Sequence, residues 1–190
     1  MPVPAIDAKA MICHRTRVIF IHQRKCAGTS IIRAFGISPR QKEWHLYNDG
    51  VLGPEFDQRP ADYRVVAVVR NPWDRFVSGW KYCKSTRRKP IREVLRVLPK
   101  EGHDYRHLTR PQHATLFRPD GTPAFDELFR FEYLAEDFGA FLGRQGIPPM
   151  RLPWLNKQQH QHYRSYFDEE TRLLFHEHFR QDIELFAYSF

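Results

Sequence analysis

The sequence predicts an α/β fold, a P-loop-like parallel sheet flanked by helices, within a single domain of residues 1–190. Two observations lead to this prediction. Apolar, β-branched runs alternate with segments of helical periodicity, which is the order of a parallel sheet with crossover helices. A chain of 190 residues with 42% hydrophobic content is also long and apolar enough to build one core of ordinary size. We expect residues 1–15 to form a flexible N-terminal segment.

The expected elements alternate between strands and helices along the chain. The apolar run 18–21 predicts a strand, and the β-branched run 65–69 predicts a central strand that is covered on both faces. Gly146, Pro148 and Pro153 interrupt the pattern before a last long helix. In chain order we expect a strand over 17–22, a helix from about Ser30, a loop over 36–62 and a strand over 63–70. Helices over 73–84 and near 91–98 follow, then a loop over 99–123 and a short strand or helix-to-strand segment around 128–132. The last expected helices lie near 135–145 and 168–186. This order predicts helices on both faces of a parallel sheet.

The segment RVIFIHQRKCAGTS, residues 17–30, has the composition of a phosphate-binding turn. A buried strand leads into a short turn and a helix N-terminus, where backbone N–H groups and the helix dipole favour an anion. Gly28 allows the backbone to approach a ligand closely, and Lys25 adds a positive charge. The hydroxyl groups of Thr29 and Ser30 can donate to phosphate oxygens.

This turn differs from the P-loop of nucleoside triphosphatases. The spacing G-x-x-x-x-G-K-[ST] is absent, because Lys25 precedes Gly28 by three residues. An ordinary strand-to-helix turn, with one glycine and a capping hydroxyl residue, has the same composition. The turn alone therefore leaves both interpretations open.

The second informative segment is YRVVAVVRNPWDRFVSGWKY, residues 63–82. Arg70 stands where the expected strand ends, and Ser78 lies in the helix that follows. Ligands of open α/β sheets bind beyond the carboxyl ends of the strands, so both residues are candidates for a second phosphate of the same ligand. The alternative is a surface ion-pair cluster of Arg70, Asp74 and Arg75, with Ser78 as a neutral helix residue.

Together, the two segments resemble the 5′-phosphosulfate loop and the 3′-phosphate motif of the sulfotransferases that use 3′-phosphoadenosine 5′-phosphosulfate (PAPS). The first is similar to the family pattern H-x-P-K-x-[AG]-G-T-[ST], and the second to R-[DN]-P-[WY]-x-R-x-x-S. The matching residues are His22, Lys25, Ala27, Gly28, Thr29, Ser30, Arg70, Asn71, Pro72, Trp73, Arg75 and Ser78. Arg24 stands where the family usually has proline, which adds a positive charge beside the phosphosulfate and loosens the turn.

Further segments resemble the membrane-type and bacterial carbohydrate branch of this family. They are residues 107–141, residues 152–156 and the closing DIELFAY, residues 182–188. The resemblance implies an enzyme that moves a sulfuryl group from PAPS to a hydroxyl of a carbohydrate or glycosylated small molecule and releases adenosine 3′,5′-bisphosphate (PAP). It implies cofactor-binding roles for Arg24, Lys25, Cys26, Ala27, Gly28, Thr29, Ser30, Arg70 and Ser78.

Sulfuryl transfer requires charge stabilisation and benefits from a general base. It is an in-line displacement at a multiply oxygenated centre, so positioning and electrostatics carry most of the catalysis. Lys25 is the candidate that stabilises the bridging oxygen as its bond breaks. His45 is the candidate base, because imidazole titrates near neutrality and relatives carry a histidine between the two cofactor motifs. We expect no metal requirement, because the donor has less charge than a nucleoside triphosphate and the turn supplies cations.

Other residues compete for the base and acceptor roles. His107 and His113 lie in the loop expected to border the acceptor, as a base or as substrate contacts. Glu132, at an expected strand end, is a candidate substrate contact or an alternative base, or else a structural hydrogen-bond acceptor. His103 and His107 have the i,i+4 spacing of a helical metal pair, but Gly102 and the lack of further ligands favour a loop. The aromatic candidates for stacking on adenine or on a sugar ring are Trp44, Tyr47, Trp73 and Trp154.

The formal net charge of +8 favours an anionic ligand. Residues 81–118 hold 11 Lys and Arg against 3 Asp and Glu, whereas residues 119–190 hold 7 against 12. The basic middle segment either lines an acceptor groove or is a solvated helix face. We expect a hydroxyl-bearing sulfate acceptor as the partner, and no nucleic acid.

Cysteine content and hydropathy predict the compartment. Cys13, Cys26 and Cys83 are too few and too unevenly spaced for a disulfide framework or a zinc site, so we expect reduced thiols. No apolar run has the length of a signal-peptide core or of a membrane span. The sequence therefore predicts a cytoplasmic enzyme, or the soluble catalytic domain of a longer protein, without a transmembrane segment.

Two other classes of function remain open. A P-loop-type kinase that transfers phosphoryl from ATP needs a magnesium-binding carboxylate after a strand, and Arg70 stands at that place. A non-catalytic basic module for nucleic acid or glycans would account for the charge but not for the two phosphate motifs. Nucleotide preference distinguishes the three classes.

Overall fold

The computed structural model describes residues 11–36, 60–100, 102, 104–105, 108, 110–153 and 161–190. The chain divides into two compact units. The first unit consists of Met1–Val69 and Ala114–Leu155, and the second of Arg70–His113 and Asn156–Phe190. Each unit has a hydrophobic core of its own. That residues 1–190 act as one domain stays a prediction.

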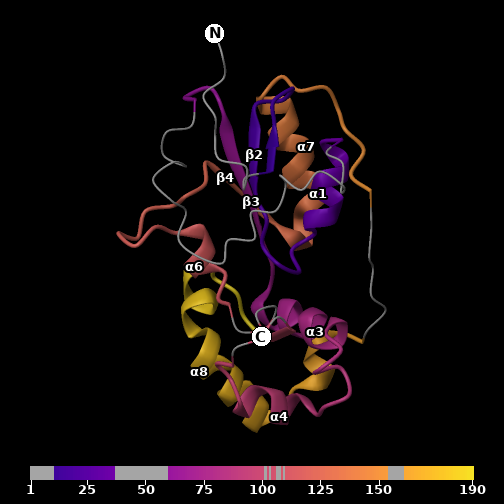
Figure 1. Cartoon of the computed structure of the whole chain (residues 1–190), viewed down its shortest axis with the longest axis vertical. Coiled ribbons are helices and arrows are strands. Elements are labelled where there is room, and N and C mark those ends of the chain that lie inside the picture. Colours follow the sequence, from indigo (N-terminus) through magenta and orange to yellow (C-terminus); the bar gives the residue numbers. More distant parts are fainter. Residues whose placement is uncertain are drawn as a thin grey trace. The chain divides into compact units, whose positions relative to one another are not determined.

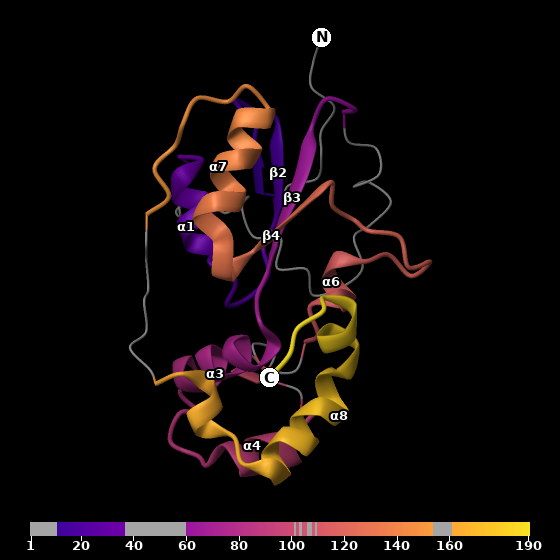
Figure 2. The same ribbon diagram turned by 180° about the vertical axis from the view of Figure 1, so that it is seen from behind.

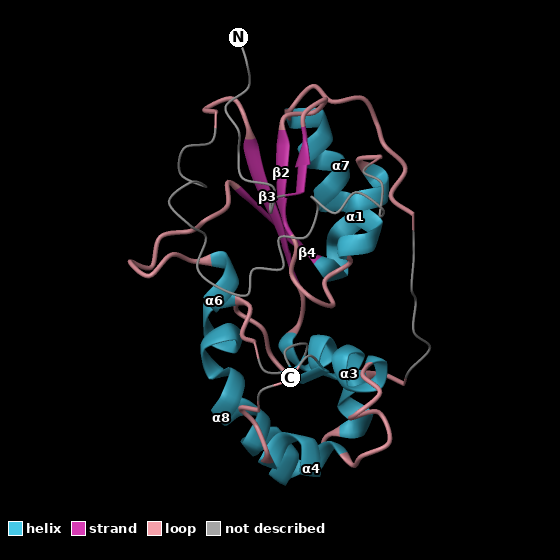
Figure 3. Ribbon diagram, in the orientation of Figure 1, coloured by secondary structure: helices cyan, strands magenta, loops and turns pink. Residues whose placement is uncertain are grey.

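The first unit contains a four-stranded sheet in the order β1-β2-β3-β4 (Figure 1). Its strands are β1 (Met11–Cys13), β2 (Val18–Ile21), β3 (Arg64–Val69) and β4 (Glu127–Arg130). The pairs β2–β3 and β3–β4 are parallel, with Ile21 opposite Ala67. The predicted strands over 17–22 and 63–70 are confirmed to within one residue at each end, and the fold is mixed α/β as predicted (Figure 3).

β1 departs from the prediction of a wholly parallel sheet and of a flexible segment over 1–15. It pairs with β2 in the antiparallel direction, with Met11 opposite Phe20. The connection between the two strands is a tight turn in which Arg17 has a φ of 54°. So short a connection joins only antiparallel neighbours. A strand of three residues is too short for hydrophobic periodicity to predict.

The core of the first unit lies between the sheet and two helices, α1 (Gly28–Ala34) and α7 (Leu134–Arg144). Both helices lie on the same side of the sheet in the opposite views of Figures 1 and 2. The strands contribute alternate residues, which share one face of a pleated sheet. The core includes Val18, Phe20, Ile31, Ile32, Val66, Val68, Phe129, Phe138 and Phe141. Within the described part of this unit, α1 and α7 thus cover one face, whereas the sequence predicts helices on both.

The other face of the two central strands is buried as well. Its apolar residues have no exposed surface, which explains why both strands are apolar at every position from 18 to 21 and from 65 to 69. These residues are Ile19, Ile21, Val65, Ala67 and Val69. The prediction of a central strand that is covered on both faces is confirmed.

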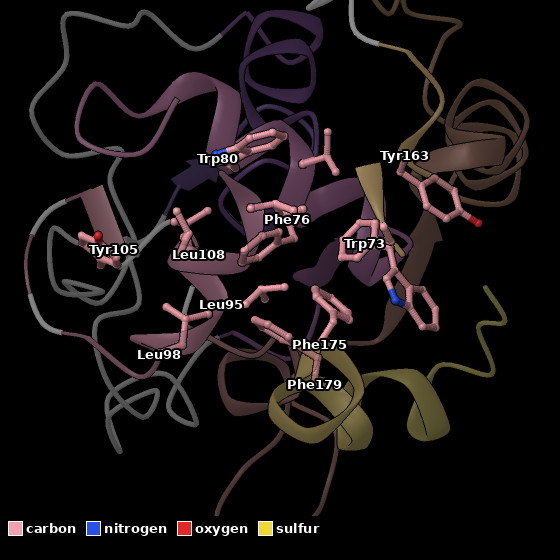
Figure 4. Close-up of a cluster of buried hydrophobic side chains, with 14 of the residues drawn as sticks. Trp73, Phe76, Trp80, Leu95, Leu98, Tyr105, Leu108, Tyr163, Phe175 and Phe179 are labelled. Carbon is pink, nitrogen blue, oxygen red and sulfur yellow. The ribbon is translucent and has the colours of Figure 1, made fainter. Parts of the chain in front are cut away.

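The second unit is helical. Its main helices are α3 (Pro72–Tyr82), α4 (Ile91–Arg96) and α8 (Glu169–Leu185), with a short 3₁₀ helix η3 (Tyr163–Tyr166). Aromatic side chains of α3 and α8 meet in its core with residues of α4 (Figure 4). The rings of Phe175 and Phe179 on α8 stack with their centroids 4.5 Å apart.

Side chains cap α3 and α8 at their N-termini. The Asn71 side chain accepts hydrogen bonds from the backbone N–H groups of Trp73 and Asp74 at the start of α3. Asp168 and Thr171 form a capping box at the start of α8. The predicted helices over 73–84, 91–98, 135–145 and 168–186 are confirmed with ends within two residues.

The remaining elements are short. The helix α6 (His113–Leu116) falls inside the expected loop over 99–123, and β4 continues into a 3₁₀ helix, η2 (Phe131–Tyr133). Most of the expected loop over 36–62 lies outside the described residues. In the described ranges, no helix has the length and apolar character that crossing a bilayer requires.

Candidate functional site

The turn between β2 and α1 contains two non-glycine residues in the left-handed conformation. Lys25 has a φ of 66°, and Ala27, the N-cap of α1, has a φ of 55°. This conformation costs residues with a Cβ on the order of 1–3 kcal/mol and is concentrated at ligand sites and tight turns. The surrounding structure therefore holds this turn in a shape that its residue types do not favour.

The N-terminus of α1 is not capped by a side chain. Ala27 has no side-chain oxygen that could accept a hydrogen bond from the N–H groups of the first turn, and the first turn contains no acidic residue. An anion beside Gly28 and Thr29 would therefore meet backbone N–H groups without a competing carboxylate in that turn.

Gly28 is required by a contact within the turn. A Cβ at this position would overlap the imidazole ring of His22, which stacks on Phe20 with centroids 5.9 Å apart. From the sequence, we expect a glycine at position 28 because it lets the backbone approach a ligand closely. The structure adds a second reason, because the backbone of α1 begins directly against the His22 ring.

The residues predicted to bind the cofactor in this turn differ in burial. Arg24, Lys25, Ala27 and Thr29 are half-buried, whereas Cys26, Gly28 and Ser30 are buried. The side chain of Cys26 belongs to the hydrophobic core of the first unit. Any contribution of Cys26 to a ligand site would therefore come from its backbone.

Arg70 forms an ion pair with Asp74. The Nε and Nη2 atoms of Arg70 lie 2.9 and 2.7 Å from Oδ2 of Asp74. The ion pair was one of the two sequence interpretations, but its location differs from a surface cluster, because Arg70 is only 8% exposed. The Nη2 atom of the buried Arg75 donates to the carbonyl oxygen of Arg110 at 2.9 Å.

Two further residues of the second segment are buried on α3. Ser78, predicted to contact a phosphate, is 6% exposed. Trp73, one of the aromatic candidates for stacking on adenine, is buried and stacks on Phe175 with centroids 5.4 Å apart. One face of the Trp73 ring therefore belongs to the aromatic core of the second unit.

Gln112 binds the backbone of Arg70 at two points. Its Oε1 accepts from the Arg70 N–H at 3.0 Å, and its Nε2 donates to the Arg70 carbonyl oxygen at 2.9 Å. Gln112 is fully buried. The side-chain amide of Gln112 thus makes with Arg70 the two backbone hydrogen bonds that a neighbouring strand would make. Arg70 is the residue that directly follows β3.

Asp182 of α8 binds the segment that contains Gln112. Its carboxylate accepts from the backbone N–H groups of Gln112 at 2.6 Å and His113 at 2.9 Å. Oδ1 also lies 2.6 Å from Nδ1 of His113. Asp182 has no exposed surface, whereas the His113 side chain is 19% exposed. A carboxylate can only accept here, so Nδ1 of His113 carries the proton and Nε2 is the basic nitrogen of the neutral ring.

Sequence reasoning missed Gln112 and Asp182. The signal for Asp182 was present, because a single acidic residue shares the buried face of α8 with Phe175, Phe179 and Ile183. A carboxylate on the buried face of an amphipathic helix needs donors from another segment. The sequence does not specify which segment supplies them.

Of the other predicted site residues, Glu132 lies in the described part of the chain. Glu132 is exposed and lies on η2, directly after β4. His45 and His107, and with them the metal-pair alternative at His103, lie outside the described residues. The described residues contain no group of three or more His, Cys, Asp or Glu side chains that could hold a metal ion. Cys13, Cys26 and Cys83 are buried, free thiols.

A scan against protein-family models, a search of curated proteins and a search of solved structures found no match to this chain.

Proposed function

We propose that this protein is a sulfotransferase that moves a sulfuryl group from PAPS to a hydroxyl of a carbohydrate or of a glycosylated small molecule. One observation carries the proposal: each of the two motif-like segments begins where one of two adjacent parallel strands ends. Residues 23–30 follow β2, and residues 70–78 follow β3. Ligands of open α/β sheets bind beyond the carboxyl ends of the strands. We also propose that the sheet belongs to the P-loop-like folds.

The assignment of the 5′-phosphosulfate to residues 24–30 is supported by the conformation of the turn. Two left-handed residues, an uncapped helix start and the absence of an acidic residue in the first turn all favour an anion over a cation. Lys25 and Arg24 add positive charge. Thr29 is half-buried, so its hydroxyl belongs to a partly accessible part of the turn.

The assignment of the 3′-phosphate to Arg70 and Ser78 is supported by the ion pair with Asp74. A guanidinium that one carboxylate already holds has a fixed orientation before a phosphate arrives, which reduces the entropy lost on binding. The N-terminus of α3 contributes less to such a site, because Asn71 already accepts hydrogen bonds from two of its N–H groups.

The chemistry assigns two roles to side chains of this chain. When bound, PAPS supplies a sulfuryl group whose bond to the 5′-phosphate oxygen breaks as the acceptor oxygen bonds to sulfur. Lys25 Nζ would neutralise the charge that develops on that phosphate oxygen. His45 would accept the proton of the acceptor hydroxyl. Both groups act without a metal ion.

Nucleotide-dependent thermal stabilisation tests this function. The protein is heated with PAP, with ADP and with ATP plus magnesium, and a second series contains EDTA. We expect PAP to raise the melting temperature in EDTA, and ADP, which lacks the 3′-phosphate, to raise it much less. A larger shift with ATP plus magnesium than with PAP would favour a kinase and contradict the proposal. Equal shifts with PAP and ADP would also contradict it.

A further inference from the structure

We infer that Gln112 and Asp182 are positioning residues that hold Arg70 in place and so determine selectivity for a 3′-phosphorylated nucleotide. The inference rests on the proposed function, because it assigns to Arg70 the contact with the 3′-phosphate. All of the groups involved belong to the second unit.

The first step is the contact between Gln112 and Arg70. The amide of Gln112 both accepts from and donates to the backbone of Arg70, at 3.0 and 2.9 Å. Two hydrogen bonds of opposite direction fix the peptide groups on both sides of the Arg70 Cα. They therefore fix the point from which the Arg70 side chain starts.

The second step is the contact between Asp182 and Gln112. A buried carboxylate must be compensated by donors, and Asp182 finds three of them in Gln112 and His113. The backbone N–H of Gln112 is one of these donors. The carboxylate of α8 therefore holds the backbone of Gln112, while the side chain of Gln112 holds Arg70.

The far end of the Arg70 side chain is held separately. Asp74 binds the guanidinium through Nε and Nη2. Arg75 provides another link between the same segments, because it donates to the carbonyl oxygen of Arg110. The guanidinium position therefore depends on two anchors, one at the backbone of Arg70 and one at its tip.

This arrangement points to a positional role beyond packing. Apolar side chains of similar volume could fill the same space without a need for matched donors and acceptors, often with no loss of stability. Recognition of a phosphate by a guanidinium requires its position to within about 0.5 Å. A network of fully paired polar groups specifies such a position better than apolar packing does.

The test measures affinities for PAP and for AMP, which lacks only the 3′-phosphate, by titration calorimetry. The main variant is Gln112→Glu, which keeps the shape and the acceptor but replaces the donor that faces the Arg70 carbonyl. The matched control is Gln181→Glu, the same exchange at an exposed position beside Asp182 on α8. Asp182→Asn tests the second anchor, and Asp74→Asn tests the anchor at the tip.

We expect Gln112→Glu and Asp182→Asn to weaken the binding of PAP about tenfold and to leave the affinity for AMP unchanged. The Kd for AMP divided by the Kd for PAP should therefore fall about tenfold. Asp74→Asn should also change the ratio of the dissociation constants for AMP and PAP. Gln181→Glu should keep the wild-type ratio. A purely structural role would lower the melting temperature or weaken both nucleotides equally.

Failure of the inference is distinguishable from failure of the proposed function. A wild-type protein that binds PAP and AMP equally well contradicts the proposed function itself. A wild-type preference for PAP that survives in folded Gln112→Glu overturns only the positioning role. If Asp182→Asn does not fold, the isosteric Gln112 variant alone decides the question.

Discussion

The buried carboxylate of Asp182 holds the imidazole of His113, with Oδ1 and Nδ1 2.6 Å apart. The carboxylate fixes the tautomer, because it accepts the Nδ1 proton and leaves Nε2 as the basic nitrogen. In the described residues, no hydrogen bond to Nε2 of His113 is found. Three histidines, His45, His107 and His113, are predicted for the base or acceptor roles, and His113 is the one that the structure describes. Its effect on turnover can be compared with that of His45 by mutation.

Replacement of His45 tests the assignment of the general base. His45→Ala should lower transfer to a hydroxyl acceptor by about 10²-fold or more, because the acceptor proton has no base to receive it. Binding of PAP should stay normal, and the acid limb of the pH profile should disappear. His113→Ala should act mainly on the KM of the acceptor. If His113→Ala or Glu132→Gln abolishes turnover while His45→Ala keeps most of it, the base is the residue whose replacement abolishes turnover.

Replacement of Lys25 separates catalysis from binding. Lys25→Ala should lower kcat by roughly 10²-fold or more, because the charge on the leaving oxygen loses its counter-ion in the transition state. The affinity for PAP, which has no sulfuryl group, should fall less. Steady-state kinetics and calorimetry on the same preparation measure the two quantities. Normal turnover with only a raised KM for PAPS would assign Lys25 to ground-state binding.

The contact between His22 and Gly28 predicts a conditional effect on stability. Gly28→Ala places a methyl group on the His22 ring and should lower the free energy of unfolding by about 1–3 kcal/mol. In the double variant with His22→Ala the added methyl group has room, so the effect of Gly28→Ala should become smaller. Urea unfolding of all four proteins gives the coupling. If the effects of Gly28→Ala and His22→Ala on the free energy of unfolding are strictly additive, the His22 ring is not what excludes a Cβ at position 28.

The N-cap of α8 predicts a dependence of stability on acid pH. Hydrogen bonds from the hydroxyl and backbone N–H of Thr171, with a further one from Arg92, lower the pKa of Asp168 from its usual 3.8 to about 2. The carboxylate therefore stabilises the folded state fully above pH 4, and this stabilisation is lost as the pH falls from about 4 to about 2.

Asp168→Asn is the matched variant, because asparagine also caps helices but does not titrate. The difference in melting temperature between wild type and Asp168→Asn should shrink as the pH falls through this interval. Melting curves of both proteins at several pH values between neutral pH and pH 2 measure this difference. A difference that stays constant from neutral pH to pH 2 would contradict the assignment.

Features that depend on neighbouring residues were predictable from the sequence. The apolar runs 18–21 and 65–69 specify two central strands, because every position is buried. The ion pair between Arg70 and Asp74 joins residues that are four positions apart in the sequence, Arg70 just before the N-cap of α3 and Asp74 in its first turn.

Features that depend on contacts between distant segments were not predictable. Gln112 and Arg70 are 42 positions apart, and Gln112 and Asp182 are 70 positions apart. No periodic pattern specifies which buried polar groups will meet. The antiparallel pairing of β1 was missed for a related reason, since three residues carry too little periodicity to distinguish a strand from a loop.

Titration of the metal-free protein with PAP and AMP, in EDTA, tests the central claim most directly when wild type and Arg70→Ala are compared. Wild type should bind PAP more tightly than AMP. Removal of one charge-assisted contact of about 1.5–3 kcal/mol should weaken PAP by about one to two decades in Arg70→Ala and leave AMP almost unchanged. Equal affinity of the wild type for PAP and AMP, or an unchanged PAP affinity in Arg70→Ala, would contradict the account.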